Sequence, residues 1–504
     1  MAAKNKSIKD KGNSTEINTT LNEGVSKIPT GIRGFDTILE GGMPMGRALL
    51  VTGSTGTGKT VFTNEFLYRG ITEFNENGVY VTFEERPSDI IRNVRNFGWD
   101  FDKLISQNKL AFVDVSPDII STKVTGEYDL SILIDRIKYA VTKVNAKRVA
   151  IDALSTLFTR FPDKEKIRDT IFFVCDALKS IGVTSMITAE KPHGEVKFVS
   201  RYGVEEYVVD GVVDLDFETG QQQFVRKLFV KKLRGTGFRS GSIEFEITNK
   251  GLEVFPKIKI DRRISKTDFK IRKKIGVNGI DEAIGGGIPM GHSVLISGNT
   301  GTGKSLLNLH FIVQGIKEGE NAIYVALEEP IEQIKKTALS FGFHLDKYEK
   351  EGKLVFISPS LIDVSIDKLL NEIVVETNKI DAKRIVIDSI SSLKSATMSE
   401  ESVRQFLIQA TGFFKTSGAT TLINYLSSVN FGAEKGQLLG VMETTMMRLS
   451  SILDGIIVLL YVEREQKIKR LLYFLKMRGS WHSNNIFQYE INNNGINFGE
   501  IFHD

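Results

Sequence analysis

An internal repeat constrains the fold of this chain more than any other feature of its sequence. The stretch GIRGFDTILEGGMPMGRALLVTGSTGTGKT returns later in the chain as GVNGIDEAIGGGIPMGHSVLISGNTGTGKS. Matching residues keep almost the same offset, which is 245 from Lys59 to Lys304 and 244 from Lys232 to Lys476. A period this long indicates duplication of a whole domain, because solenoid repeats are only about 20–50 residues long. The 504 residues are therefore expected to form two homologous domains in tandem.

Short apolar stretches and helical stretches alternate in both copies. The strand-like stretches ALLVT and SVLIS each precede a glycine-rich loop, and TVFTNEFLYRGI or SLLNLHFIVQGI follows it with a helical period. Further strand-like stretches are VYVTFEE, RVAID and SMITAE in the first copy, and IYVALEE, RIVID and TTLINY in the second. This alternation predicts an α/β fold in which each domain has a mostly parallel, doubly wound sheet.

Both glycine-rich loops match the phosphate-binding loop, or Walker A, pattern between a strand and a helix. Glycines in such a P-loop let backbone N–H groups turn toward the phosphates at the positive end of the following helix. The lysine of the loop reaches the phosphates, and the hydroxyl after it lies where Mg²⁺ can use it. The predicted nucleotide-binding residues are Gly53, Ser54, Thr55, Gly56, Thr57, Gly58, Lys59 and Thr60 in the first copy and Gly298, Asn299, Thr300, Gly301, Thr302, Gly303, Lys304 and Ser305 in the second.

Carboxylates stand at the ends of other predicted strands in each copy. Asp152 and Asp388 end RVAID and RIVID, where a carboxylate beside the loop can hold the water shell of Mg²⁺ together with the loop hydroxyl. The pairs Glu84-Glu85 and Glu328-Glu329 end two further strands at the sheet edge where α/β ligand sites form. A glutamate there can orient or deprotonate an attacking water or hydroxyl, while its neighbour can be a solvated strand end.

A pair of cations recurs late in each copy, in KLRG (232–235) and KMRG (476–479). Lys232 and Arg234, like Lys476 and Arg478, are two residues apart, so on a strand they project to the same face. Their shared position suggests that they contact phosphate in a neighbouring subunit as trans-acting residues. A surface ion pair is the alternative interpretation.

The two copies also differ in informative places. The first is about eight residues longer between its acidic pair and its strand aspartate, most simply around residues 117–128, and extra loop length often serves as a docking surface. Aligning DGVV (210–213) with DGII (454–457) places Ser450 and Ser451 opposite Glu206 and Tyr207. Adjacent hydroxyls in only one copy are candidate phosphoacceptors, although serines before a strand are commonly turn or capping residues.

The charge of the chain is concentrated in one stretch. Lysine and arginine number 66 against 62 aspartate and glutamate, which gives +4 in total. The stretch PKIKIDRRISKTDFKIRKK (256–274) holds nine basic and two acidic residues, so the rest of the chain carries −3. This balance indicates a solvated linker between the domains and gives no support to a nucleic-acid-binding surface.

The remaining composition predicts a cytoplasmic, globular protein. With 41% hydrophobic residues the chain can bury a sizeable core, and its longest apolar stretch, residues 456–462, is far shorter than the roughly 20 residues that span a bilayer. Residues 1–26 are charged and lack the apolar centre of a secretory signal, so we expect a disordered tail there. The single cysteine, Cys175, forms no internal disulfide and is expected to be buried.

Several longer motifs carry a family resemblance. EERPSDI and EEPIEQI after the acidic pairs, SRYGVEEYV, KLRGT and KMRGSWH make the sequence similar, from about Ile28 to Gly495, to the KaiC family of tandem RecA-like ATPases and autokinases, which includes the cyanobacterial circadian clock protein. The resemblance implies RecA-like P-loop NTPase domains at residues 27–256 and 275–504, joined by the linker at 257–274. It also implies a double-ring homohexamer with ATP and Mg²⁺ between neighbouring subunits.

The resemblance further implies a role for each candidate residue. In the first domain, a slow ATPase, Glu84 and Glu85 match the catalytic pair, and Lys232 and Arg234 match the trans-acting residues. In the second, an autokinase and autophosphatase, Glu328 matches the general base with Glu329 beside it, Lys476 and Arg478 match the partner-subunit cations, Ser450 and Ser451 match the phosphorylated pair, and Thr445 matches an auxiliary threonine. Two serines at the acceptor positions depart from the family's Ser-Thr pattern.

The resemblance also bears on partners and on the biological role. Residues 125–137 look like the segment that docks KaiB, so we expect a KaiB-like partner at the first domain. The chain stops at Asp504, before the tail that KaiA grasps, so KaiA-type regulation is not expected. The expected function is an ATPase and autokinase/autophosphatase in a clock-like, timer or stress-response system. The alternatives are a RecA- or RadA-like DNA-dependent ATPase, as a recombinase or ring helicase, and an ATP-binding scaffold without phosphotransfer.

Overall fold

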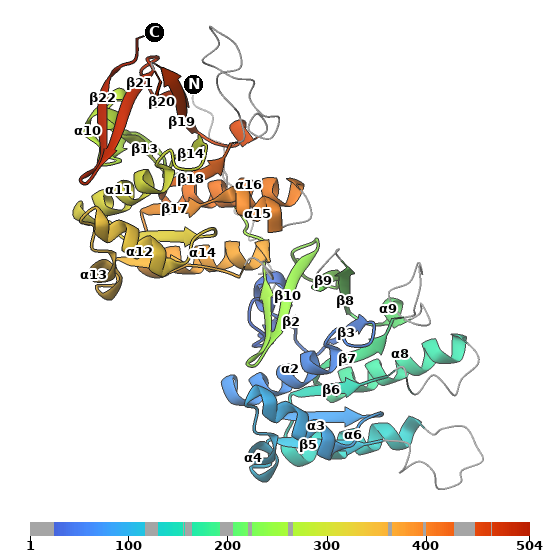
Figure 1. The fold of residues 1–504 in the computed structure, drawn as a ribbon. Coiled ribbons are helices and arrows are strands. Elements are labelled where there is room, and N and C mark those ends of the chain that lie inside the picture. Colours follow the sequence, from blue (N-terminus) through green and yellow to red (C-terminus); the bar gives the residue numbers. More distant parts are fainter. Residues whose placement is uncertain are drawn as a thin grey trace, which may run out of the picture. The chain divides into compact units, whose positions relative to one another are not determined.

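The computed structural model describes residues 25–115, 130–154, 156, 164–191, 205–219, 224–260, 266–360, 365–396, 400–427, 449–464 and 466–503. The chain divides into two compact units, and each repeat contributes one nine-stranded sheet (Figure 1). Most of the expected N-terminal tail, the loop at 117–128, and Thr445 lie outside the described residues.

The sheet of the first repeat has the strand order β11-β10-β9-β8-β3-β7-β6-β4-β5. Strands β3, β4, β5, β6, β7 and β8 pair in parallel, and β9 and β10 pair antiparallel. The strands are β3 (Ala48–Gly53), β4 (Gly78–Thr82), β5 (Leu110–Asp114), β6 (Arg148–Asp152), β7 (Thr184–Glu190), β8 (Gly211–Thr219), β9 (Phe224–Leu233), β10 (Ile243–Thr248) and β11 (Gly251–Phe255), and a separate pair is formed by β1 (Lys27–Ile28) and β2 (Met43–Pro44).

Helices flank this sheet. The helices are α1 (Phe35–Ile38), α2 (Lys59–Glu73), α3 (Pro87–Val94), α4 (Phe101–Ser106), α6 (Leu130–Val144), α8 (Lys164–Ile181) and α9 (Glu205–Val208), with a 3₁₀ turn at Arg95–Phe97. Apolar residues of α6 and α8 form one core with alternate residues of the parallel strands. Cys175 on α8 packs against this core, and burial raises the pKa of its thiol to about 12, so it behaves as a small apolar residue.

The sheet of the second repeat has the equivalent order β16-β15-β17-β18-β14-β19-β20-β21-β22. Its first six strands in this order pair in parallel, and β19 to β22 pair antiparallel. The predicted α/β fold with a mostly parallel sheet in each domain is therefore confirmed. The strands are β14 (Ser293–Gly298), β15 (Ala322–Ala326), β16 (Leu354–Ile357), β17 (Arg384–Asp388), β18 (Thr420–Leu426), β19 (Gly455–Arg464), β20 (Lys467–Met477), β21 (Phe487–Asn492) and β22 (Gly495–Ile501).

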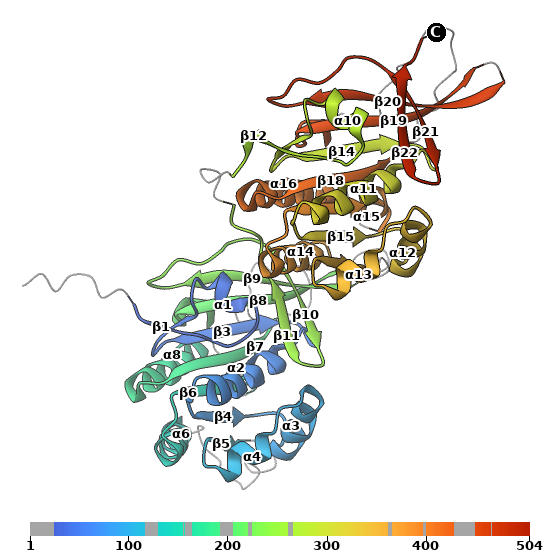
Figure 2. The same cartoon turned by 90° about the vertical axis from the view of Figure 1, so that its left-hand side faces the viewer.

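Helices cover both faces of the second sheet, as Figure 2 shows. One core contains α11 (Lys304–Lys317), α12 (Ile331–Ser340) and α13 (Leu345–Lys350), and the other contains α14 (Ile366–Ile380), α15 (Ile390–Ala396) and α16 (Glu400–Ser417). A short helix, α10 (Asn278–Ala283), lies near the start of the second repeat. Part of the basic stretch that was expected to be a linker forms β12 (Asp268–Lys273), which pairs with β13 (Ile288–Met290).

A fully buried arginine occupies the start of the same strand in each repeat. Arg148 on β6 donates to the carbonyls of Phe66 at 3.0 Å and Pro29 at 2.7 Å, and pairs with Glu76 at 2.6 Å. Arg384 on β17 pairs with Glu318 at 2.7 Å and Glu320 at 2.5 Å. A Cβ on Gly70 or Gly315 would lie 2.4 Å from the arginine side chain, so glycine is required on the helix that passes over it.

Replacing Arg384 with leucine is expected to lower the free energy of unfolding of the second repeat by about 3–5 kcal/mol, because Glu318 and Glu320 lose their buried partner. Urea unfolding of the full chain, followed by hydrogen exchange of β17 peptides, measures this loss. The exposed-lysine variant Lys350→Ala serves as control. A loss below about 1 kcal/mol, the range of an ordinary surface ion pair, would contradict a stabilising role of these buried ion pairs.

Glu65 on α2 predicts a pH dependence of stability in the first repeat. Its buried carboxylate accepts the Leu252 backbone N–H at 2.6 Å, and burial raises its pKa from 4.5 to about 7. The folded state therefore holds this proton more tightly, and the associated stability is present below pH 4.5 and lost as the pH rises through about 7.

Glu65→Gln removes this titration. We expect the free energy of unfolding of the variant to rise relative to the parent by roughly 3 kcal/mol between pH 4.5 and 8. Denaturant titrations of parent and variant at several pH values test this, since other titrating groups cancel in the difference. A difference that is independent of pH would contradict the assignment.

Candidate functional site

The glycine-rich loop of each repeat has the same backbone geometry. It joins β3 to α2 in the first repeat and β14 to α11 in the second, as the sequence predicts. Gly58 and Gly303 have φ values of 105° and 93°, in the left-handed region that favours glycine. A Cβ on Gly58 would also lie 2.8 Å from the Ile247 side chain. The glycines therefore allow the tight turn that places the loop at the helix N-terminus, as in a phosphate-binding loop.

Each loop lysine lies across its own loop. Lys59 Nζ donates to the carbonyls of Gly53 at 2.8 Å and Ser54 at 3.0 Å, and Lys304 Nζ donates to Gly298 at 2.7 Å and to Asn299 at 2.9 Å. Burial lowers the pKa of both ammonium groups, and nearby carboxylates oppose this shift. For Lys59 these are Glu190, Asp152 and Glu84; for Lys304 they are Asp388 and Glu328. The loop, the strand aspartate and the acidic pair are thus brought together in both repeats.

Neutral donors hold the strand aspartates in place. Asp152 accepts the Tyr80 hydroxyl at 2.9 Å and the Thr188 hydroxyl. Asp388 accepts the Tyr324 hydroxyl at 2.7 Å and the Asn424 amide at 2.8 Å. Sequence analysis missed these partners, which come from neighbouring strands and could have been found only from the strand order.

The acidic pairs lie just beyond the strands that were predicted to include them. β4 ends at Thr82 and β15 at Ala326, so the glutamates stand in the turns that follow. Glu84 accepts the Thr156 hydroxyl at 2.5 Å, and Glu328 accepts the Ser389 hydroxyl at 3.0 Å. Burial, followed by the charge of Asp152 or Asp388, raises the pKa of the other member of each pair, Glu85 and Glu329.

The donor set suits a nucleotide with Mg²⁺ better than a metal ion alone. In the described part of the chain, no group of three or more His, Cys, Asp and Glu side chains could hold a metal by itself. Thr60 and Ser305 are partly accessible in the first turn of their helices, and Asp152 and Asp388 supply carboxylate oxygens. Because Mg²⁺ usually takes one or two protein oxygens plus phosphates and water, these residues fit it only together with a bound nucleotide.

The basic pairs bind carbonyl groups of the segment just before β8 or β19. Lys232 Nζ donates to the Val209 carbonyl at 2.7 Å, and Arg234 donates to the Tyr207 carbonyl at 3.2 Å. The lysine is on its strand, as predicted, whereas the arginine lies just past the strand end. These contacts are charge-assisted hydrogen bonds to the backbone.

The same arrangement in the second repeat holds the candidate phosphoacceptors. Lys476 Nζ donates to the carbonyls of Ser450 at 2.5 Å and Leu453 at 2.8 Å, and Arg478 donates to the Ser451 carbonyl at 2.9 Å. Ser450 is half-buried and Ser451 is exposed. The structure thus brings both serines and both cations together.

These cations and serines lie at the opposite end of the sheet from the loop of the same repeat. The serines belong to the acceptor segment (residues 449–453), which Asp454 and Gly455 follow. Gly455 pairs with Val294 near the start of β14, whereas the loop follows Gly298 at the end of that strand. Val294 and Gly298 are four residues apart on β14, which corresponds to roughly 13 Å along the strand. The acceptor end and the nucleotide end of one repeat are therefore distinct.

A family model described as "ATPase: KaiC" matches residues 28–259 and 273–502. The chain belongs to the KaiC family. It is 38% identical over 485 residues to the circadian clock oscillator protein KaiC of Synechococcus elongatus, with 96% of this chain and 91% of that protein covered. It is 39% identical over 502 residues to the protein of that name from Prochlorococcus marinus subsp. pastoris, with coverages of 98% and 96%. The two KaiC ATPase domains make the chain a tandem P-loop ATPase that binds ATP.

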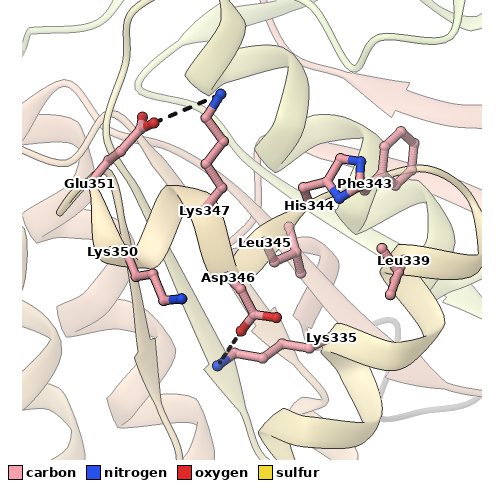
Figure 3. A pocket seen from close by; sticks show the side chains of 9 residues that line it. All are labelled: Lys335, Leu339, Phe343, His344, Leu345, Asp346, Lys347, Lys350 and Glu351. Atoms are coloured by element: carbon pink, nitrogen blue, oxygen red, sulfur yellow. Dashed lines mark ion pairs between the residues drawn. The ribbon is translucent and has the colours of Figure 1, made fainter.

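Two further observations concern parts of this KaiC family member other than the loops. None of the helices that the structure describes has the length and apolar character to traverse a lipid bilayer. A cavity of about 520 Å³ lies between α12 and α13, lined by Lys335, Leu339, Phe343 and their neighbours (Figure 3). An ion pair between Lys335 and Asp346 spans 3.0 Å beside it, and no residue of the loop, the acidic pairs or the basic pairs lines it.

Each loop lysine is expected to be required for nucleotide binding at its own repeat only. Lys59→Ala and Lys304→Ala should each reduce the Mg-ATP bound per chain from two molecules to one, because the phosphates lose the buried cation. Equilibrium binding of labelled ATP measures the stoichiometry, with Lys350→Ala as control. Retention of two sites with unchanged affinity in either variant would contradict the site assignment.

Proposed function

We propose that this chain is an autokinase and autophosphatase as well as an ATPase, and that its second repeat phosphorylates Ser450 or Ser451. The supporting observation concerns the acceptor segment, residues 449–453. It carries two adjacent hydroxyls, and Lys476 and Arg478 donate hydrogen bonds to its backbone carbonyls. The aligned segment of the first repeat carries Glu206 and Tyr207 instead. The relatives named as clock oscillators make a clock-like, timer or stress-response role the natural biological setting.

The acceptor and the nucleotide must come from different subunits. The serines lie at the end of the second sheet away from the loop that begins at Gly298, so they cannot reach the phosphates bound by their own repeat. An assembly in which the acceptor end of one subunit faces the nucleotide end of the next brings them together. Such head-to-tail contacts close into a ring, and we propose the homohexameric double ring of the family. Lys476 and Arg478 then contact the neighbour's ATP in trans, as Lys232 and Arg234 do in the first ring.

In the transfer step, Glu328 accepts the proton of the serine hydroxyl, and the serine oxygen attacks the γ-phosphorus. The bond to the leaving oxygen of ADP breaks as the new bond forms. Lys304 holds the phosphates, and Ser389 orients Glu328 through its hydroxyl. Mg²⁺ held near Ser305 and Asp388 would neutralise charge on the β- and γ-phosphates.

The first repeat is expected to transfer the same group to water. Glu84, oriented by the Thr156 hydroxyl, lies near the loop lysine, and Glu85 lies near Asp152. Either carboxylate can orient the water. We further propose a KaiB-like protein as partner of this repeat, on the basis of family resemblance over residues 125–137, of which 125–129 lie outside the described residues.

Incubation of the full chain with labelled ATP and Mg²⁺, followed by phosphosite mapping, tests the transfer. We expect label on Ser450 or Ser451, its loss in the Ser450→Ala/Ser451→Ala variant, and a decrease of about 100-fold or more in Glu328→Gln, because the general base is removed. Glu84→Gln is the matched control and should retain the label. Label that persists in the double alanine variant, or that is insensitive to Glu328→Gln, would overturn the assignment.

A further inference from the structure

A buried carboxylate connects the acceptor segment to the rest of the second repeat. Asp454 follows the segment directly and its side chain is only 4% exposed. One oxygen accepts the Lys415 ammonium at 2.8 Å, and the other accepts the backbone N–H of Ser293 at 3.1 Å. Asp454 therefore joins the last turn of α16 to the start of β14.

The same residue also contacts the arginine that binds the acceptor segment. The Asp454 carbonyl accepts the backbone N–H of Arg478 at 2.8 Å, and one carboxylate oxygen lies 3.9 Å from the Arg478 guanidinium. Arg478 in turn donates to the Ser451 carbonyl at 2.9 Å. A continuous series of polar contacts thus runs from Lys415 through Asp454 and Arg478 to the backbone of an acceptor serine.

The charge at this end of the sheet is unbalanced. Among the described residues, the cations Lys415, Lys476 and Arg478 all lie close enough to the Asp454 carboxylate to interact with it. The nearby His292 is buried, and burial lowers its pKa, so it adds no charge at neutral pH. The excess positive charge favours the approach of a phosphoryl group and its retention on serine.

The equivalent region of the first repeat lacks this series of polar contacts among the described residues. The backbone carbonyl of its aligned aspartate, Asp210, accepts the Arg234 backbone N–H at 2.8 Å, but no ion pair to the Asp210 carboxylate occurs among the described residues. Arg47, the counterpart of His292, instead donates to the Arg234 carbonyl at 2.7 Å. A charge network needed only to hold the fold would be expected in both repeats, yet it occurs in the repeat that carries the adjacent serines.

We propose that Asp454 is a positioning residue of the phosphotransfer site, which fixes Lys415 and Arg478 and thereby sets which of the two serines is presented to the γ-phosphate. This inference rests on the proposed function. Ser450 and Ser451 are adjacent, so a small rotation of their segment exchanges one hydroxyl for the other. Since displacement by about 1 Å can change a transfer rate by about 100-fold, the choice between them depends on how firmly the segment is held.

The experiment compares the full chain with Asp454→Asn, which keeps the side-chain size but removes the charge. Phosphosite mapping after incubation with labelled ATP and Mg²⁺ gives the ratio of label on Ser450 to label on Ser451. We expect this ratio to change at least fivefold in Asp454→Asn, to change in the same direction in Lys415→Met, and to be kept in the conservative variant Lys415→Arg. Asp210→Asn, at the matching position of the first repeat, should leave the ratio unchanged.

A second measurement separates this inference from the proposed function. Hydrogen exchange of the backbone amides of residues 449–454 reports how firmly the segment is held, whether or not phosphate is transferred. We expect exchange at least tenfold faster in Asp454→Asn than in the parent, with other second-repeat peptides unchanged. Absence of label in the parent would refute the autokinase proposal alone, whereas unchanged exchange would refute the positioning role. Lower total label at a constant ratio would show that Asp454 is merely structural, and if Asp454→Asn fails to fold, Lys415→Met decides by the same two measurements.

Discussion

In each repeat, one buried arginine connects the strand that ends in the site aspartate to the helix that begins with the loop lysine. Arg148 starts β6, which ends at Asp152, and it binds the Phe66 carbonyl of α2. Its counterpart Arg384 starts β17 and packs against Phe311 of α11, with 4.6 Å between the guanidinium carbon and the ring centre. A buried charge tolerates little displacement, because its hydrogen bonds are lost when it moves. The arginine thus fixes the position of the helix along the strands of the sheet. This position in turn sets the distance between the loop and the carboxylates.

The parallel sheet places the loop and the acidic residues at one end of its strands and the basic pair at the other. The carboxyl ends of β3, β4 and β6 gather the loop and the acidic residues at one edge, as parallel strands do in α/β proteins generally. Strand β20 runs antiparallel to β19 and carries its basic pair back to the opposite end of the sheet, and β9 occupies the equivalent position in the first repeat. One repeat therefore does not place its basic pair beside its own loop, and this separation supports the proposed assembly with a neighbouring copy. In the proposed assembly, the basic pair of one copy would complete the nucleotide site of the next.

The sequence predicts this architecture well where local signals suffice. The loops, the strands around Asp152 and Asp388, and the alternation of elements follow from glycine spacing and apolar periodicity. The positions of Glu84 and Glu328 after their strands were not predicted, because the apolar pattern of VYVTF and IYVAL continues past the last strand residue. The basic residues of β12 suggested a linker, although strand pairing with β13 overrides their charge. The contact between Lys415 and Asp454 joins residues 39 positions apart, and only the fold reveals it.

The duplication shows which positions are fixed by the fold and which are free to take up new chemistry. The backbone N–H of Leu252 in the first repeat is accepted by Glu65, and that of its counterpart Ile496 is accepted by His310. The preceding glycine has a positive φ in both repeats, 113° and 107°, and a Cβ there would also collide with the acceptor, so both positions require glycine. The backbone requirement is thus constant, whereas the side chain that meets it changes. The nucleotide end keeps the backbone of the loop together with its lysine, the strand aspartate and the acidic pair. At the acceptor end the basic pair and the aspartate before the strand are kept, whereas Arg47 is exchanged for His292 and Tyr207 for Ser451. Under the proposed function, this exchange makes the second repeat the target of the phosphoryl group that its neighbour's loop binds.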